Sequence, residues 1–257
     1  MGIVITIANE KGGVGKTSVA TTLADGFKRC GYKTLLIDAD PQRNSTTTFH
    51  GKTEDEYTML DIFERECSIA QAVQHTDVGD IVPGDRALKN REGYYAAVTD
   101  GFYILDERIE EVKALYDIIL IDTPPHIGTF TTNALVASDG IIIPTMPQTY
   151  SISGVKEIFG TIQSVQKRLN NKLKVYGVLV IAYDGRNNLD REIDDKLNVI
   201  KKEIGLDFHI FNTKIRKCQE VQKAQDENKT LFEYSSKCNT ALDYVDFIKE
   251  LMIILGA

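Results

Sequence analysis

The stretch Asn9-Glu10-Lys11-Gly12-Gly13-Val14-Gly15-Lys16-Thr17-Ser18 decides the fold of this 257-residue chain. It follows a β-branched run, Ile3 to Ala8, and leads into an Ala/Thr/Leu-rich segment with the composition of a helix. A glycine loop between a strand and a helix lets backbone N–H groups and the helix N-terminus surround a polyphosphate. The pattern therefore predicts a phosphate loop at the carboxyl end of the first strand.

The residues of this loop suit different parts of a bound nucleotide. The glycines permit the backbone angles and the close approach that phosphate binding requires. Lys16 is expected to reach the β- and γ-phosphates, and Thr17 to offer its hydroxyl to Mg²⁺. The predicted nucleotide-binding residues are Lys11, Gly12, Gly13, Val14, Gly15, Lys16, Thr17 and Ser18.

Beyond the loop, short apolar runs alternate with segments of helical period from end to end. The spacing of apolar residues predicts helices over 152–169, 193–204 and 242–255. Strands are predicted at Ile3 to Ala8, Thr34 to Asp38, Asp80 to Val82, Ile118 to Asp122, Gly140 to Pro144, Val175 to Ala182 and Phe208 to Phe211. Strands that are apolar throughout and separated by helices indicate a mostly parallel sheet with both faces covered.

We therefore expect a single α/β domain over residues 1–257, with a mostly parallel, twisted sheet flanked by helices. Residues 49–106 mix charges, glycines and short helical pieces, and are interpreted as an irregular helical insertion at the surface. No N-terminal helix-turn-helix domain is expected, because the first predicted strand begins at Ile3.

Composition excludes several classes of protein. The chain has 30 Lys+Arg against 37 Asp+Glu, a net charge of -7, and 42% hydrophobic residues, as expected for a folded globular domain. Its apolar runs are far shorter than the ~18 to 20 residues that a membrane-spanning helix needs, so no integral membrane association is expected. Cys30, Cys67, Cys218 and Cys238 show no zinc-ligand spacing and are interpreted as unpaired thiols in a reducing cytosol.

The loop departs from the usual pattern in one informative way. Glu10 stands where a glycine is usual, and it is followed by an additional lysine, Lys11. The resulting Lys-Gly-Gly-Val-Gly-Lys-Thr resembles the deviant phosphate loop, or deviant Walker A motif, of the ParA/MinD superfamily of P-loop ATPases. The resemblance is greatest to the short, Soj-like ParA ATPases of plasmid and chromosome partition. It implies ATP and Mg²⁺ as cofactors, and it implies that Lys11 reaches the nucleotide of the partner subunit across a dimer interface.

Two further carboxylate motifs agree with this resemblance. Leu35 to Gln42 is similar to the family's switch I segment, which implies that Asp40 positions the attacking water and that Asp38 lies near Mg²⁺. A carboxylate beside the γ-phosphate can orient water, so this assignment is also chemically reasonable. Asp122 ends the apolar run 118–121 at the carboxyl end of a predicted strand, where a Walker B carboxylate is expected. The expected catalytic residues are Lys11, Lys16 and Asp40, and the expected metal-site residues are Thr17, Asp38 and Asp122.

The C-terminal third matches the family less well. Residues 180–189 resemble a family segment near the base pocket and the DNA-facing edge, whereas residues 215–218 read Ile-Arg-Lys-Cys where many relatives have Ile-Pro-Arg-Asn. Positive charge is concentrated here, with a net +4 over 164–202 and +2 over 213–237, which leaves -13 for the remainder. Such charge suits a salt-sensitive contact with DNA phosphates, although solvated helix faces give the same count. The candidate DNA-binding residues are Arg186, Arg216 and Lys217.

The resemblance implies a DNA-partitioning ATPase that turns over slowly without its partner. ATP would close a sandwich homodimer that holds nonspecific double-stranded DNA, and a centromere-binding, ParB-like protein would stimulate hydrolysis and release. The expected location is the cytoplasm, on the nucleoid. One alternative is a MinD-like membrane-associated positioning ATPase, but residues 243–250 lack the Lys/Arg face that attracts anionic lipid. A nucleotide-gated regulatory scaffold is the other alternative, and the sequence leaves it open.

Overall fold

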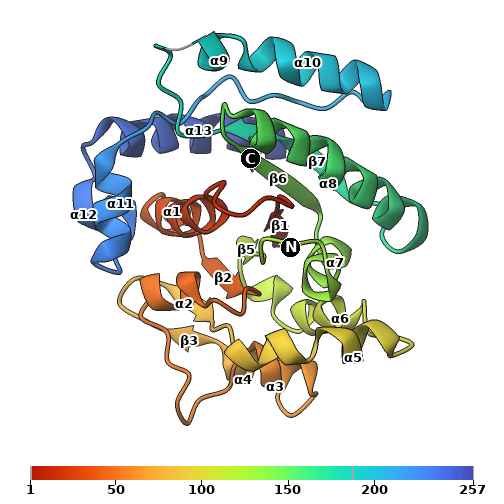
Figure 1. The fold of residues 1–257 in the computed structure, drawn as a ribbon. Coiled ribbons are helices and arrows are strands. Elements are labelled where there is room, and N and C mark those ends of the chain that lie inside the picture. Colours follow the sequence, from red (N-terminus) through yellow and green to blue (C-terminus); the bar gives the residue numbers. More distant parts are fainter. Residues whose placement is uncertain (1, 187, 257) are drawn as a thin grey trace.

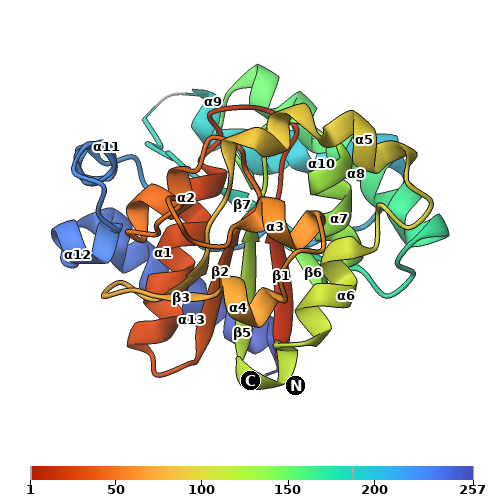
Figure 2. The same cartoon turned by 90° about the horizontal axis from the view of Figure 1, so that it is seen from below.

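The chain forms one mostly parallel β-sheet that is covered by helices on both faces (Figures 1 and 2). This is a computed structural model that describes residues 2–186 and 188–256, without the side chains of residues 149–153 and 189. The predicted contributions of the Ile152 side chain and of Asn187 therefore lie outside the described residues.

Seven strands make up the sheet in the described part of the chain, in the order β3-β4-β2-β5-β1-β6-β7. All neighbouring strands run parallel except β3, which is antiparallel to β4. The strands are β1 (Ile3–Ile7), β2 (Thr34–Asp38), β3 (Gln74–His75), β4 (Asp80–Val82), β5 (Ile118–Asp122), β6 (Gly140–Thr145) and β7 (Lys174–Val180). The predicted fold class, a single mostly parallel α/β domain, is confirmed.

Helices connect the strands and cover the sheet. They are α1 (Lys16–Arg29), α2 (Asn44–Thr48), α3 (Met59–Phe63), α4 (Ile69–Ala72), α5 (Glu92–Ala97), α6 (Ile104–Glu110), α7 (Thr129–Val136), α8 (Thr149–Arg168), α9 (Asn188–Arg191), α10 (Ile193–Ile204), α11 (Gln219–Asp226), α12 (Leu231–Ser235) and α13 (Asn239–Leu255), with short 3-10 turns at Arg86–Asn90 and Lys113–Leu115. Residues 49–106 contribute α3 to α5, the edge strand β3 and the strand β4 beside it.

The period-two alternation of the strands decides which core each residue joins. Leu36 of β2 packs into a core with α1, α12 and α13, whereas its neighbours Leu35 and Ile37 pack with α3, α6 and α7 on the opposite face. A third core lies between β6, β7 and the helices α8 and α10. In the described residues no helix is both long enough and apolar enough to span a bilayer.

The sheet register brings three strand ends together. Ile7 of β1 and Asp38 of β2 are both aligned with Asp122 of β5, which lies between the two strands. Because parallel strands end at the same edge, the segments after β1, β2 and β5 meet there.

The prediction of a strand at Phe208 to Phe211 is wrong. This segment makes only an isolated bridge, between Val178 and Ile210, beside β7. The ladder stops because the next backbone amides, those of Asn212 and Thr213, donate to the carboxylate of Glu250 at 2.7 and 2.9 Å. The edge strand β3 was not predicted, since two residues are too short to show a period.

Candidate functional site

The loop between β1 and α1 has the backbone conformation that its glycines make possible. Gly13 and Gly15 have φ values of +73° and +71°, in the left-handed region that side chains disfavour. A Cβ on Gly15 would also lie 2.3 Å from Cδ1 of Ile181, so a larger residue here would displace the Ile181 side chain. The loop thus curls around the N-terminus of α1 at the carboxyl edge of the sheet.

Lys16, the first residue of α1, lies inside this curl. Its residue exposure is 6%, and Nζ donates to the main-chain oxygen of Lys11 at 3.0 Å. Burial lowers the pKa of Lys16, and the carboxylates of Asp122 and Asp40 oppose that shift. A desolvated ammonium held by a carbonyl is poised to exchange that contact for phosphate oxygens.

Asn9 anchors the loop, a role that no sequence motif indicated. It is buried, its Nδ2 donates to the main-chain oxygen of Pro144 at 2.8 Å, and its Oδ1 accepts from the amide of Lys11 at 3.1 Å. The first contact reaches the carboxyl end of β6 and the second fixes the loop itself. Its position directly between the strand and the glycines was the available signal.

The Lys11 side chain points away from the loop toward α8. Its Nζ lies 2.9 Å from Oε2 of Glu157, and both side chains are partly exposed, at 36% and 46%. The hydrogen bond with Glu157 raises the pKa of Lys11, so the side chain remains a cation. In this subunit the Lys11 ammonium is therefore directed toward α8 and not into its own phosphate loop.

Asp38 and Asp122 form a buried carboxylate pair at the ends of β2 and β5. Oδ2 of Asp38 accepts from the amide and the hydroxyl of Thr46, both at 2.7 Å. Burial, followed by the charge of Asp122, raises the pKa of Asp38 to about 7. Burial raises the pKa of Asp122 to about 6, although the nearby hydroxyls of Thr17 and Ser45 lower it.

One oxygen of Asp122 fits a metal site. Ser45 Oγ donates to Oδ2 at 2.8 Å, whereas Oδ1 is buried without a hydrogen bond of good geometry in the described part of the chain. The hydroxyl of Thr17 approaches the same carboxylate. Buried oxygen donors of this kind suit Mg²⁺, which keeps several waters and takes its other ligands from phosphates. Among the described residues no group of three His, Cys, Asp or Glu side chains could hold a metal ion by itself.

Asp40 lies beside this pair, at the start of the segment that leads to α2. It is 6% exposed, and its Oδ1 accepts from the amide of Gln42 at 2.9 Å. Burial raises its pKa, while the Gln42 amide, Lys16 and His126 act in the opposite direction. The carboxylate is therefore held in place but not neutralised by a direct ion pair with Lys16.

Residues that support these carboxylates were also not predicted. Ser45 and Thr46 hold Asp122 and Asp38 from α2, and Thr46 Oγ1 also accepts from the amide of Gly84 at 2.9 Å. A Cβ on Gly84 would lie 2.9 Å from the main-chain oxygen of Asp38, so only glycine permits this approach. The spacing of Ser45 and Thr46 from Asp38 gave no recognisable motif.

His126, on the segment after β5, is likewise positioned by a distant residue. Its Nε2 lies 2.9 Å from Oε2 of Glu92, whose Oε1 also accepts from the amide of Thr129 at 3.0 Å. Glu92 begins α5, so the inserted segment 49–106 contacts the loop that follows the predicted Walker B aspartate.

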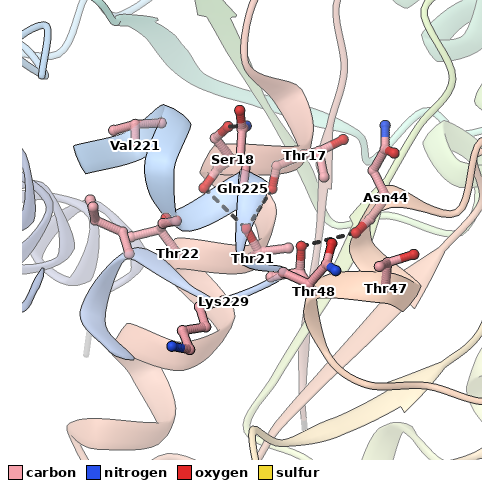
Figure 3. A pocket seen from close by; sticks show the side chains of 13 residues that line it. Thr17, Ser18, Thr21, Thr22, Asn44, Thr47, Thr48, Val221, Gln225 and Lys229 are labelled. Atoms are coloured by element: carbon pink, nitrogen blue, oxygen red, sulfur yellow. Dashed lines mark hydrogen bonds between the residues drawn. The ribbon is translucent and has the colours of Figure 1, made fainter. Parts of the chain in front are cut away.

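Two pockets flank the phosphate loop. The larger, of about 630 Å³, is lined by Gly13, Gly15 and Ser18 on one side and by residues after β7 on the other, including Ile181, Ala182, Ile215 and Tyr244. The smaller, of about 250 Å³, lies between α1, α2 and α11 (Figure 3). Figure 3 shows Thr17 and Ser18 at its rim, with Gln225 of α11 reaching Ser18, and Gln225 Nε2 lies 2.7 Å from Ser18 Oγ.

The structure gathers the three candidate DNA-binding residues around the larger pocket, together with the phosphate loop. The Arg186 side chain is 87% exposed and pairs with Asp184 at 2.5 Å. Arg216 makes a two-pronged ion pair with Asp243, through Nε at 2.9 Å and Nη2 at 2.7 Å. Lys217 is exposed, and its amide donates to the main-chain oxygen of Tyr183 at 2.9 Å. The three charges therefore lie where either DNA or a nucleotide could meet them.

Comparison with known proteins agrees with this geometry. Residues 2–175 match a protein family described as an AAA domain. The chain is 30% identical over 256 residues to the chromosome partitioning protein ParA of Caulobacter vibrioides, covering 97% of this chain and 93% of the relative. It is 31% identical over 254 residues to the sporulation initiation inhibitor protein Soj of Bacillus subtilis, covering 98% of both chains.

Solved structures share the fold. A McdA–ATP complex from Cyanothece superposes with a TM-score of 0.86 at 22% identity, covering 99% of this chain and 96% of that one. Cobyrinic acid a,c-diamide synthase from Mycobacterium smegmatis, with bound ADP and magnesium, gives 0.84 at 24% identity, covering 100% and 96%. The cell division ATPase MinD of Pyrococcus furiosus gives 0.78 at 20% identity, covering 99% and 100%. On its sequence match to ParA and Soj over nearly the whole chain, this protein belongs to the ParA/MinD superfamily of deviant Walker A ATPases.

Proposed function

We propose that this chain is an ATP-dependent DNA-partitioning ATPase, whose ATP-bound homodimer binds nonspecific DNA and is released by partner-stimulated hydrolysis. The observation that carries the proposal is the meeting of Lys16, Asp40 and the buried Asp38–Asp122 pair at one sheet edge, beside a glycine-rich loop. The partitioning role is supported by the ParA and Soj relatives, to which the chain is similar over nearly its full length.

ATP would lie with its phosphates in the loop of residues 11–18. Backbone N–H groups and the N-terminus of α1 would bind the phosphate oxygens, and Lys16 would neutralise the β- and γ-phosphates. The base would occupy the larger pocket, next to Ile181 and Tyr244. Thr17, Asp38 and Asp122 would hold Mg²⁺, which when bound supplies charge neutralisation between the phosphates.

Hydrolysis would depend on Asp40 and Lys11. The fixed carboxylate of Asp40 would orient the attacking water, since phosphoryl transfer is governed by positioning and charge. Lys11 would leave Glu157 and bind the phosphates of the partner subunit's nucleotide, which would link dimer assembly to the nucleotide. The same requirement would make turnover slow in an isolated subunit.

The closed homodimer would bind double-stranded DNA without sequence preference. Each subunit would offer few contacts to DNA phosphates, and closing the dimer would double these contacts on one face. The affinity of the dimer for DNA would therefore exceed that of one subunit, although each contact is the same. Arg186 and Lys217 are exposed cations at the rim of the larger pocket. A ParB-like, centromere-binding partner would stimulate hydrolysis and release the DNA. The protein would then act in the cytoplasm, on the nucleoid.

Sedimentation tests this proposal directly. The protein is spun with ATP, with ADP and without nucleotide, each with and without plasmid DNA. Dimers with ATP alone, and cosedimentation with DNA only when ATP is present, are expected. An ATP dimer that does not bind DNA but sediments with anionic lipid vesicles would favour the MinD-like alternative. An ATP dimer that binds neither would favour the regulatory scaffold.

A further inference from the structure

Two cysteines lie close together beside the larger pocket, and one of them, Cys218, lines it. Cys218 is the N-cap of α11 and Cys238 is the N-cap of α13. All four cysteines, which fall within the described residues, are free thiols. The thiols of Cys218 and Cys238 are in hydrogen-bonding contact, so they form a pair, unlike the exposed Cys30 and the buried Cys67.

The backbone around this pair is fixed by several short contacts. Thr240 Oγ1 donates to the main-chain oxygen of Arg216 at 2.8 Å, and the Arg216 amide donates to Oδ2 of Asp243 at 2.8 Å. Arg216 Nη2 also lies 3.3 Å from the main-chain oxygen of Asn239. The start of α13 is therefore held against Arg216, two residues from Cys218, so that the segments that carry the two thiols lie side by side.

The two thiols differ in their surroundings. The Cys218 thiol donates a hydrogen bond to Oε2 of Glu220, a carboxylate that can take its proton. Cys238 Sγ accepts from the amide of Ala241 at 3.4 Å, and burial raises the pKa of its thiol. Cys218 is therefore placed to react first, because a carboxylate lies in contact with its thiol, and Cys238 is placed to react second.

We propose that Cys218 and Cys238 form a reversible disulfide when the protein meets a peroxide. Cys218 gives its proton to Glu220, and its sulfur attacks one peroxide oxygen while the O–O bond breaks. With hydrogen peroxide the products are a sulfenic acid on Cys218 and one water. Cys238 then attacks the Cys218 sulfur, the S–O bond breaks, and the hydroxyl leaves with the Cys238 proton as a second water. A dithiol reductant returns both thiols.

The disulfide would close a loop over residues 219–237, which contain α11 and α12. This segment lines both pockets: Val221 and Gln225 contribute to each, and Lys229 contributes to the smaller one. Gln225 also holds Ser18 of the phosphate loop helix (Figure 3). A disulfide that joins the two ends of this segment would restrict its opening. It would therefore slow the release of bound nucleotide. This consequence, unlike the disulfide itself, rests on the proposed function.

The disulfide is tested by mass spectrometry on the full-length protein in a Cys30→Ser background, which removes the exposed competing thiol. After brief treatment with hydrogen peroxide, the denatured protein is expected to lose the mass of two hydrogen atoms and to regain it with dithiothreitol. Peptide mapping should then show residues 218 and 238 joined. The Cys218→Ser and Cys238→Ser variants should each lack the crosslink, and only the latter should accumulate sulfenic acid. Oxidation without a Cys218–Cys238 crosslink would overturn the proposal.

The consequence is tested by following release of a fluorescent ADP analogue from the reduced and oxidised protein. Release from the oxidised form should be several-fold slower, and the Cys238→Ser variant should show no such change. Equal rates in the two forms would overturn the proposed effect on the pockets. If the reduced protein does not bind the analogue at all, the proposed function fails, whereas the mass measurement still decides the disulfide.

Discussion

The ammonium of Lys11 and the carboxylate of Glu157 form an ion pair of 2.9 Å between the phosphate loop and α8. Both groups are partly exposed, and ion pairs of this kind contribute little to stability because water and salt screen them. The ion pair therefore holds Lys11 loosely against its own subunit, and it must break before Lys11 can reach the nucleotide of a partner.

Removing the ion pair between Lys11 and Glu157 should strengthen ATP-dependent dimerisation. Glu157→Gln keeps the size of the side chain and removes its charge, so Lys11 loses its partner on α8. We expect ATP-dependent dimerisation to strengthen by no more than roughly fivefold, because an exposed ion pair is weak. Analytical ultracentrifugation at several protein concentrations measures the change, with Lys156→Gln, which affects a neighbouring pair with Glu203, as the control. Weaker dimerisation would show that Glu157 itself belongs to the dimer interface.

Lys16→Ala should abolish most nucleotide affinity while the protein stays folded. The ammonium is the buried cation of the loop, and each charge-assisted hydrogen bond to phosphate contributes about 1.5–3 kcal/mol, which predicts a loss of roughly 100-fold. Stability should be unchanged or slightly higher, since burial lowers the pKa of Lys16 and keeping the charge is unfavourable without a ligand. Calorimetry with ATP checks affinity, and Lys33→Ala, at an exposed position before β2, is the control. Unaltered affinity would remove Lys16 from the phosphate site.

Asp40→Asn should allow the dimer to assemble with ATP but should prevent most ATP hydrolysis. The amide oxygen still accepts from the Gln42 amide, so the segment is expected to keep its conformation. The carboxylate that orients water is lost, and the turnover of the ATP dimer should fall by about 100-fold or more. Phosphate release together with sedimentation measures both properties. A variant that hydrolyses ATP at the parental rate would show that another group positions the water.

The buried carboxylate pair makes stability depend on pH in a definite direction. Folding raises the pKa of Asp38 to about 7 and of Asp122 to about 6, so the folded state holds protons that the unfolded state releases. Stability without nucleotide should therefore be highest below the unfolded pKa, near 4, and should fall as the pH rises to about 7. Urea unfolding across this range should show the decline, and Asp122→Asn should flatten it. A parental slope in Asp122→Asn would mean that the pair does not govern the dependence.

The sequence alone predicts the site residues that lie at the ends of strands or at the start of a helix. The positions of Lys16, Asp38 and Asp122 could be predicted because each stands where an apolar strand ends or a helix begins, and that pattern is local. Their partners were not found, since Glu157 and Glu92 reach the site from helices that are remote in the sequence. The same limit explains the wrong strand at Phe208 to Phe211, where Glu250 of the distant α13 takes the backbone amides that a strand would use.

Charge reversal at Arg186 and Lys217 should weaken the binding of DNA and spare that of ATP. Each cation that no longer pairs with a DNA phosphate should lower the slope of log affinity against log salt by about one unit, counted per subunit. Arg216 is expected to behave differently because its guanidinium is held by Asp243 and its main-chain oxygen accepts from Thr240, at the wall of the larger pocket. Arg216→Glu should therefore reduce ATP affinity and stability as well as DNA retention.

Fluorescence anisotropy with a duplex of random sequence, at several salt concentrations and with saturating ATP, measures the slopes, and Lys33→Glu is the control of equal charge change. If Arg186→Glu and Lys217→Glu together leave the slope unchanged, the DNA-binding face lies elsewhere, and the exposed Lys167 and Arg168 at the end of α8 become the next residues to reverse.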